Sequence, residues 1–352
     1  MRLSTSEPSV KLPHHQNVDM VSRTHFPILD YSQARVDYDA FSKKLFAVCS
    51  EWGFFILTGT DIKPRRMFEL SQEFFNLPLE LKATKIMNEK ALGYDGKAKT
   101  TFAASEGMSF GTTPGGVLET DDLPEWWDHD KRNEVEAFKA DCYDLSSMLL
   151  SCFADQLGFS RDFFRQSHLH KDPGNTLKLI RYPPMAVHPG QEIPRLSEHT
   201  DWGSITFVFT NQAGLEIRDP QNHWRQIPVV EDGIVINIGD ALSLWTGKAL
   251  KSTMHRITWE NLPLDKDRYS IAYFTNPNYD AIMRPEKANP DPSHPVITYR
   301  DYYKIRLRLT YGHLKGETGQ NQFEDVDAQI LNTIRKLEVA NAGILESHAI
   351  VA

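Results

Sequence analysis

Apolar and polar positions follow two different periods along the chain, and the period changes near residue 176. Before that point, apolar residues recur every three or four positions around 41–49 and 131–157, as on one face of an α-helix. Beyond it, apolar and polar residues alternate in short runs separated by Gly, Pro, Asn and Asp, as in strands joined by turns. The pattern predicts helices in the first half and a β-rich core in the second.

The first half also contains a stretch with little periodicity, residues 88–116, which is rich in Gly, Thr and Ser. We expect a long loop there, and long loops in compact domains are often lids over binding sites. The other elements predicted in this half are strands at 26–30 and 52–57 and helices at 41–49, 64–77, 131–157 and 162–167.

The second half predicts many short strands, which suggests a jelly roll made of two sheets. The fold class we expect is mainly β with flanking helices. The predicted strands are 177–182, 204–210, 215–219, 233–238, 241–245, 252–258 and 268–276, and helices follow at 299–312 and 325–342.

Composition narrows the classes of function. The 352 residues carry a net charge of −8 and no run of Lys or Arg, so nucleic acid is not an expected partner. No stretch reaches the roughly 18 apolar residues of a membrane span, and the first residues carry no apolar signal core. The three cysteines lack the spacing of a metal site and are expected to be buried free thiols. We expect a cytoplasmic monomer that binds a small molecule.

The most informative motif is His199-Thr200-Asp201, followed by His255 on a later predicted strand. Side chains two apart in a strand point the same way, so His199 and Asp201 would share a face. Two imidazoles and one carboxylate form the ligand set of non-haem Fe(II) oxygenases, in which other coordination positions stay open. A His-x-Asp triplet also arises by chance. His168-Leu169-His170 is a comparable pattern, in a connection where we expect exposed side chains.

Arg268 and Ser270 share one face of the last predicted strand. A guanidinium beside a hydroxyl binds a carboxylate well, and an Arg inside a barrel is costly unless it meets an anion. The plainer interpretation is an exposed Arg on an edge strand, but the following residues are largely apolar. Tyr182 and Lys178 share a face of another strand and are possible further contacts to an anion; packing or solvent exposure explains them equally well.

With these residues in place, the chain resembles the iron(II)/2-oxoglutarate-dependent dioxygenases, in the isopenicillin N synthase-like branch. The resemblance covers roughly residues 25–315. It rests on several segments in the family's order: Phe26-Pro27-Ile28-Leu29-Asp30, Glu51-Trp52-Gly53-Phe54-Phe55, residues 75–82, Tyr182-Pro183-Pro184, His199-Thr200-Asp201-Trp202-Gly203, Asn237-Ile238-Gly239-Asp240, His255-Arg256-Ile257 and Arg268-Tyr269-Ser270.

The resemblance implies a double-stranded β-helix core, with iron held by His199, Asp201 and His255. It implies that Arg268 and Ser270 hold the distal carboxylate of 2-oxoglutarate, with Tyr182 nearby. One departure is Ile180, where plant members often have Asn, and it weakens any transfer of a plant hormone or flavonoid substrate.

The domain organisation expected from pattern and resemblance has four parts. Residues 1–24 form a flexible arm, and 25–170 form an N-terminal helical and α/β region. Residues 171–315 form the Fe(II)/2-oxoglutarate jelly roll, and 316–352 form a C-terminal helical tail.

The function expected is oxidation of a small organic molecule, by hydroxylation or else by desaturation or cyclisation, in secondary metabolism. Fe(II), O₂ and 2-oxoglutarate would take part, with release of succinate and CO₂. The alternatives are an iron oxidase of the isopenicillin N synthase type that needs no 2-oxoglutarate, and a non-catalytic small-molecule binding protein. The residues expected to line the substrate pocket are Phe274, Tyr279, Met108, Phe110, Ile344 and Leu345.

Overall fold

The computed structural model describes residues 25–96, 105–184, 195–258, 265–283 and 297–311. The predicted arm at 1–24, the tail at 316–352 and the helix at 325–342 lie outside these ranges. Among the described residues, no helix is long and apolar enough to cross a bilayer.

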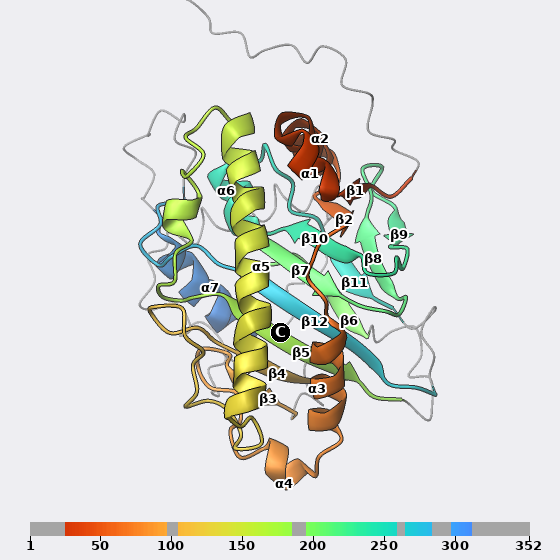
Figure 1. Cartoon of the computed structure of the whole chain (residues 1–352), viewed down its shortest axis with the longest axis vertical. Coiled ribbons are helices and arrows are strands. Elements are labelled where there is room, and N and C mark those ends of the chain that lie inside the picture. Colours follow the sequence, from red (N-terminus) through yellow and green to blue (C-terminus); the bar gives the residue numbers. More distant parts are fainter. Residues whose placement is uncertain (1–24, 97–104, 185–194, 259–264, 284–296, 312–352) are drawn as a thin grey trace, which may run out of the picture.

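Two β-sheets dominate the structure (Figure 1). The major sheet has eight strands in the order β1-β2-β10-β7-β12-β5-β4-β3, and the minor sheet has four in the order β6-β11-β8-β9. The strands are β1 Ile28–Asp30, β2 Phe54–Thr58, β3 Gly93–Asp95, β4 Glu106–Phe110, β5 Thr176–Tyr182, β6 Leu196–His199, β7 Ile205–Phe209, β8 Leu215–Arg218, β9 Trp224–Gln226, β10 Ile234–Ile238, β11 His255–Ile257 and β12 Arg268–Thr275.

Helices cover one face of the major sheet, and Figure 1 shows the long α5 crossing it beside α3. Asp37 and Asp128 cap the helices α2 and α5, since each side chain accepts a hydrogen bond from a first-turn N–H. The helices are α1 Ser32–Val36, α2 Tyr38–Glu51, α3 Arg65–Phe75, α4 Leu79–Lys82, α5 His129–Gln156, α6 Asp240–Trp245, α7 Tyr299–Tyr311 and the 3₁₀ turn Arg165–Ser167.

Side chains that alternate between the two faces of the major sheet contribute to two hydrophobic cores. One core lies between the helices and the major sheet, with Leu70, Phe138 and Phe209 among its members. The other includes Phe54 and Tyr182 from the major sheet and Ile217 from the minor sheet, so it fills the space between the sheets. The double-sheet core predicted from the alternating pattern is confirmed.

The N-terminal strands are part of the same sheet as the later ones. Ile234 of β10 pairs with Leu57 of β2, and Leu177 of β5 pairs with Phe110 of β4. The region expected at 25–170 therefore supplies four strands, β1 to β4, to the sheet shared with the jelly-roll region.

Two predictions of secondary structure differ from the structure. The strand predicted at 241–245 is the helix α6, in which Ser243 N–H donates to Gly239 O and Thr246 N–H to Leu242 O. A segment of only five residues, here Ala-Leu-Ser-Leu-Trp, does not distinguish the two states by its period. The long loop predicted at 88–116 contains the strands β3 and β4, and residues 97–104 between them lie outside the described ranges.

Candidate metal and co-substrate site

The three predicted metal ligands converge at one end of the two sheets. His199 ends β6 and His255 begins β11, and these residues pair directly across the minor sheet. Asp201 Oδ1 lies 3.7 Å from His199 Nε2 and 3.6 Å from His255 Nε2. Two ligands of one ion at about 2.1 Å are at most about 4.2 Å apart. Both separations from Asp201 are below this limit, and all three donor atoms lie within 4.8 Å of one another, so the group could hold one metal ion.

Backbone carbonyls orient both imidazoles. His199 Nδ1 lies 2.8 Å from Ser197 O, and His255 Nδ1 lies 3.3 Å from Thr253 O. A carbonyl only accepts, so each Nδ1 carries the proton and each Nε2 lone pair faces Asp201. Burial and the neighbouring His199 lower the pKa of His255 to about 4, so its ring is neutral at pH 7.

Asp201 is held as an anion. Burial alone would raise its pKa, but the positive charge that His255 and His199 carry when protonated, and hydrogen bonds from Thr206 and Asn237, lower it below its usual value. Asn237 Nδ2 donates to Asp201 Oδ2 at 2.7 Å. One carboxylate oxygen is therefore tied to the barrel wall while the other faces both histidines.

The exposure of the three side chains shows where the site opens. The His199 side chain is 36% exposed, against 9% for Asp201 and 8% for His255. On the inner side, the His255 ring packs edge-on against Phe54 at 5.3 Å. Entry to the metal position is therefore on the His199 side.

Strand register places the predicted anion site on the same face as the ligands. Asn237 pairs with Thr206, and Thr206 pairs with Phe274 on β12, so these three side chains share the face toward Asp201. Arg268 and Ser270 lie at even steps from Phe274 along β12 and point to that face too. The structure therefore brings the metal cluster and the Arg268–Ser270 pair into the space between the sheets.

Arg268 is a buried cation whose hydrogen bonds within the described ranges go to neutral oxygens. It is 2% exposed, and it donates to Ser270 Oγ at 2.7 Å, Ala213 O at 3.0 Å and Thr210 Oγ1 at 3.4 Å. Burial lowers its pKa. A buried charge is costly without a counter-ion, so this guanidinium is suited to an incoming carboxylate.

Two more predicted residues lie beside Arg268. Tyr182 pairs with Arg268 across β5 and β12, and its ring centre is 5.3 Å from the guanidinium carbon. Burial raises the pKa of Tyr182. Lys178 is partly exposed on the same face of β5, and its charge is felt at Tyr182. The sequence analysis did not single out Arg195, whose guanidinium carbon lies 5.4 Å from the centre of the same Tyr182 ring.

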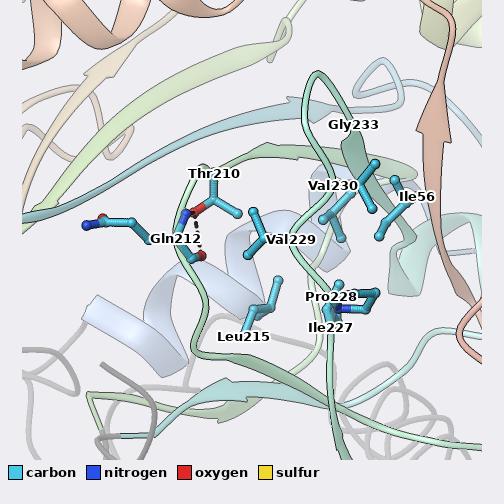
Figure 2. A pocket seen from close by; sticks show the side chains of 10 residues that line it. Ile56, Thr210, Gln212, Leu215, Ile227, Pro228, Val229, Val230 and Gly233 are labelled. Atoms are coloured by element: carbon cyan, nitrogen blue, oxygen red, sulfur yellow. Dashed lines mark hydrogen bonds between the residues drawn. The ribbon is translucent and has the colours of Figure 1, made fainter. Parts of the chain in front are cut away.

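A small apolar cavity lies beside Thr210, just after the end of β7 (Figure 2). Apolar side chains, among them Ile56, Leu215 and Val230, surround a cavity of about 10 Å³ there, which is room for roughly one water. Thr210 borders this cavity and also accepts from Arg268.

The residues predicted to line the substrate pocket do not all lie in the same place. Phe274 is partly exposed on the site face of β12. Tyr279 follows β12 and packs against Tyr303 of α7 at 6.0 Å, and Tyr303 in turn contacts Trp202 beside Asp201. Ile344 and Leu345 lie outside the described residues.

Met108 and Phe110 are not brought to this site. They pair with Leu179 and Leu177 of β5, whose side chains lie in the core under the helices. Both are fully buried there, and Phe110 packs against Trp127 at 4.7 Å. The site face of β4 carries Gly107 and Ser109 instead. A Cβ at Gly107 would lie 2.7 Å from the Lys178 side chain, so glycine leaves room for this lysine.

The sequence analysis gave no role to Asn237 or Thr206, which hold Asp201. Asn237 had been noted only as part of the segment Asn237-Ile238-Gly239-Asp240. A polar residue at an inward position of an otherwise apolar strand is the signal that would have identified it, because β10 is buried along its whole length.

Comparisons with known proteins agree with this geometry. Residues 154–277 match the model of the 2OG-Fe(II) oxygenase superfamily, and residues 26–136 match that of the non-haem dioxygenase N-terminal region named for morphine synthesis. A proline hydroxylase of Petromyces alliaceus is 30% identical over 80% of this chain and 98% of its own length. An aminocyclopropane-carboxylate oxidase of Malus domestica is 26% identical over 86% of this chain and 92% of its own.

A full-length Neurospora crassa protein, solved in complex with alpha-KG and 5-formyluracil, has a similar structure. It is 26% identical, covers 83% of this chain and 97% of its own, and superimposes with a TM-score of 0.69. The superfamily uses Fe(II), 2-oxoglutarate and O₂. With the paired sheets and the His-Asp-His cluster, these matches lead to one conclusion: the chain belongs to the 2OG-Fe(II) oxygenase superfamily and is an Fe(II)/2-oxoglutarate-dependent dioxygenase.

Proposed function

We propose that this enzyme hydroxylates a small organic molecule in secondary metabolism, with iron held by His199, Asp201 and His255. The observation that carries the proposal is the buried Arg268–Ser270 pair on the same inner face as the metal cluster. It supports a co-substrate that has one carboxylate for Arg268 and a second end that reaches the metal. Tyr182 and Lys178 complete this co-substrate site.

Each of the chain's own residues has a defined task in this proposal. When bound, Fe(II) with O₂ and 2-oxoglutarate supplies the oxidising power, and 2-oxoglutarate leaves as succinate and CO₂. Asn237 holds Asp201 Oδ2 through a hydrogen bond, so Oδ1 would be the oxygen offered to the metal, and a one-oxygen ligand would leave other positions open. The apolar cluster around Phe54 excludes water from the inner side of the site.

The substrate enters from the His199 side in this proposal, where Phe274 offers an aromatic surface. Phe274 is partly exposed, and it pairs with Thr206, which is bonded to Asp201. The relatives support a small-molecule substrate, since one is named a proline hydroxylase and the Neurospora crassa protein was solved with thymine and with 5-formyluracil. Desaturation or ring closure would use the same residues.

The test is a screen of small metabolites with the purified Fe(II) enzyme, scored by succinate release and by mass change of the candidate. The expected result is one succinate per oxidised product and a product heavier by one oxygen atom. Product without succinate would support the alternative, an oxidase in which Arg268 and Ser270 bind a carboxylate of the substrate itself. Metal binding without turnover of any metabolite or of 2-oxoglutarate would support a binding protein.

A further inference from the structure

Asp240 lies buried behind the loop that carries the first two proposed metal ligands. It is 5% exposed, and its carboxylate accepts from Thr200 Oγ1 at 2.8 Å and from Ser252 Oγ at 2.6 Å. Its N–H donates to Asp201 O at 2.7 Å. Thr200 separates the first two ligands and Ser252 precedes the third by three positions. A single residue is therefore bonded to both chain segments that deliver ligands.

The helix α7, the last one in the described ranges, reaches the same carboxylate. Tyr302 Oη donates to Asp240 Oδ2 at 3.2 Å, and Arg306 Nη2 lies 3.5 Å from that oxygen. The Arg306 guanidinium also lies over the Trp202 ring at 5.4 Å, and Tyr303 packs edge-on against Trp202 at 6.2 Å. The helix α7 therefore contacts Asp240, which is hydrogen-bonded to the segment 199–203, and Trp202, which lies in that segment; residues 199–203 are called the metal loop below.

We propose that Asp240 is a positioning residue through which the docking of α7 sets the affinity of the metal site. This inference rests on the proposed function, in which His199, Asp201 and His255 hold the metal. A buried carboxylate needs charged or polar donors to offset the loss of its hydration. Thr200 and Ser252 supply neutral donors, and Arg306 supplies the positive charge at 3.5 Å.

Loss of the Tyr302 hydroxyl and the Arg306 guanidinium would weaken the hold of Asp240 on the segments that carry the metal ligands. With the Arg306 guanidinium and the Tyr302 hydroxyl removed, the buried carboxylate has fewer partners, and its hydrogen bonds to Thr200 and Ser252 must rearrange or admit water. The loop carrying two ligands then loses its fixed geometry. Outer partners of metal ligands typically change metal affinity or activity by about 10–100-fold.

The experiment is a titration of the purified full-length protein with Co(II), followed by its visible absorption, which reports both affinity and coordination geometry. The variants are Arg306→Met, Tyr302→Phe and the two together. Arg300→Met is the matched control, since it removes the same charge from an exposed position of the same helix. Arg306→Lys keeps a positive charge near Asp240.

The double variant is expected to bind Co(II) about 10–100-fold more weakly, with an altered spectrum, while Arg300→Met matches wild type. Arg306→Lys should recover part of the loss. Equal Co(II) affinity and spectrum in Arg306→Met and wild type would overturn the proposal. So would an equal loss in Glu106→Gln, because the effect would then be general loosening; this variant on β4 is expected to lower stability through Lys82 and Arg181, which do not contact Asp240.

Tyr302→Phe removes only a hydroxyl, so it keeps the test decisive if Arg306→Met does not fold. Tyr302→Phe binding Co(II) as wild type does would then count against the proposal, and a weakened affinity would support it. Failure of the wild-type protein to bind Co(II) is a different result. It would reject the metal site under the proposed function rather than the link from α7 to that site.

Discussion

Replacing Arg268 should separate co-substrate binding from metal binding. Arg268→Met removes a guanidinium that is 2% exposed and that donates to three neutral oxygens in the described part of the chain. Removing one partner of a buried ion pair costs on the order of 3–5 kcal/mol, here in the binding free energy of the 2-oxoglutarate carboxylate. At about 1.4 kcal/mol for each factor of ten, the dissociation constant of 2-oxoglutarate should rise by about 10²–10³-fold or more.

The assay is an anaerobic titration of the Fe(II) protein with 2-oxoglutarate, followed by the visible charge-transfer band. Arg268→Lys should bind with intermediate affinity, because it keeps the charge and loses the planar fork. Arg218→Met, on β8 of the minor sheet, serves as the control for loss of one positive charge.

For the same substitution, we expect weaker 2-oxoglutarate binding but no loss of folding stability. Arg268 has a lowered pKa because its burial is costly to the charged form. Arg268→Met should therefore unfold at a urea concentration no lower than wild type when 2-oxoglutarate is absent. An unchanged dissociation constant for 2-oxoglutarate would refute the reasoning, whatever the stability, and would move Arg268 out of the co-substrate site.

Three further predictions concern the metal, the pH dependence of folding and the major sheet. Asp201→Ala should lose turnover and weaken metal binding by more than the 10–100-fold typical of outer partners, because it removes the anionic ligand; metal titration measures this. Burial lowers the pKa of His168 to about 4 from an ordinary 6.5. The buried neutral imidazole therefore contributes its full stability above pH 6.5. This contribution, roughly 3 kcal/mol, is lost as the pH falls toward 4. His168→Gln should flatten this acid loss in urea unfolding at pH 7 and pH 4.5. Glu106→Gln should cost on the order of 1–3 kcal/mol, because Lys82 and Arg181 would lose a charged partner that is partly buried.

Each of these has an outcome that would contradict it. Wild-type metal affinity in Asp201→Ala would remove this carboxylate from the ligand set. An equal acid loss in wild type and His168→Gln would show that other groups cause it. Glu106→Gln should be compared with Glu69→Gln, whose exposed ion pairs are worth about 0–1 kcal/mol; equal effects would show that the pairs of Glu106 are no stronger than surface ones.

The metal cluster could be predicted from the sequence because its ligands are few, chemically distinctive and placed on strands with clear alternation. His199 and Asp201 are separated by one residue, and His255 lies on a strand whose pattern was recognised in advance. The Arg268–Ser270 pair was found for the same reason, since its strand was predicted almost to the residue.

Other features depend on contacts that no local pattern contains. Met108 and Phe110 alternate correctly, but only their register with β5 decides which face they occupy. His168 was expected to be exposed and is 1% exposed, with its ring bonded to Phe164 O and Ser204 Oγ. β9 is only three residues long, and β6 begins just after residues outside the described ranges. The partners of such residues lie on other elements, so the sequence around them does not identify their environment.

The pairing of β2 with β10 has a consequence for how the chain folds. Leu57 and Ile234 come together only after β10 has left the ribosome, and until then β2 has β1 as its sole sheet neighbour among the described strands. Sheets built from strands that are distant in the sequence fold slowly. The strands synthesised first have unpaired edges until their partners are available. Expression at lower temperature or with chaperones should therefore raise the yield of native enzyme, and the β-rich half expressed from residue 171 should aggregate, because it lacks the strand that covers β10.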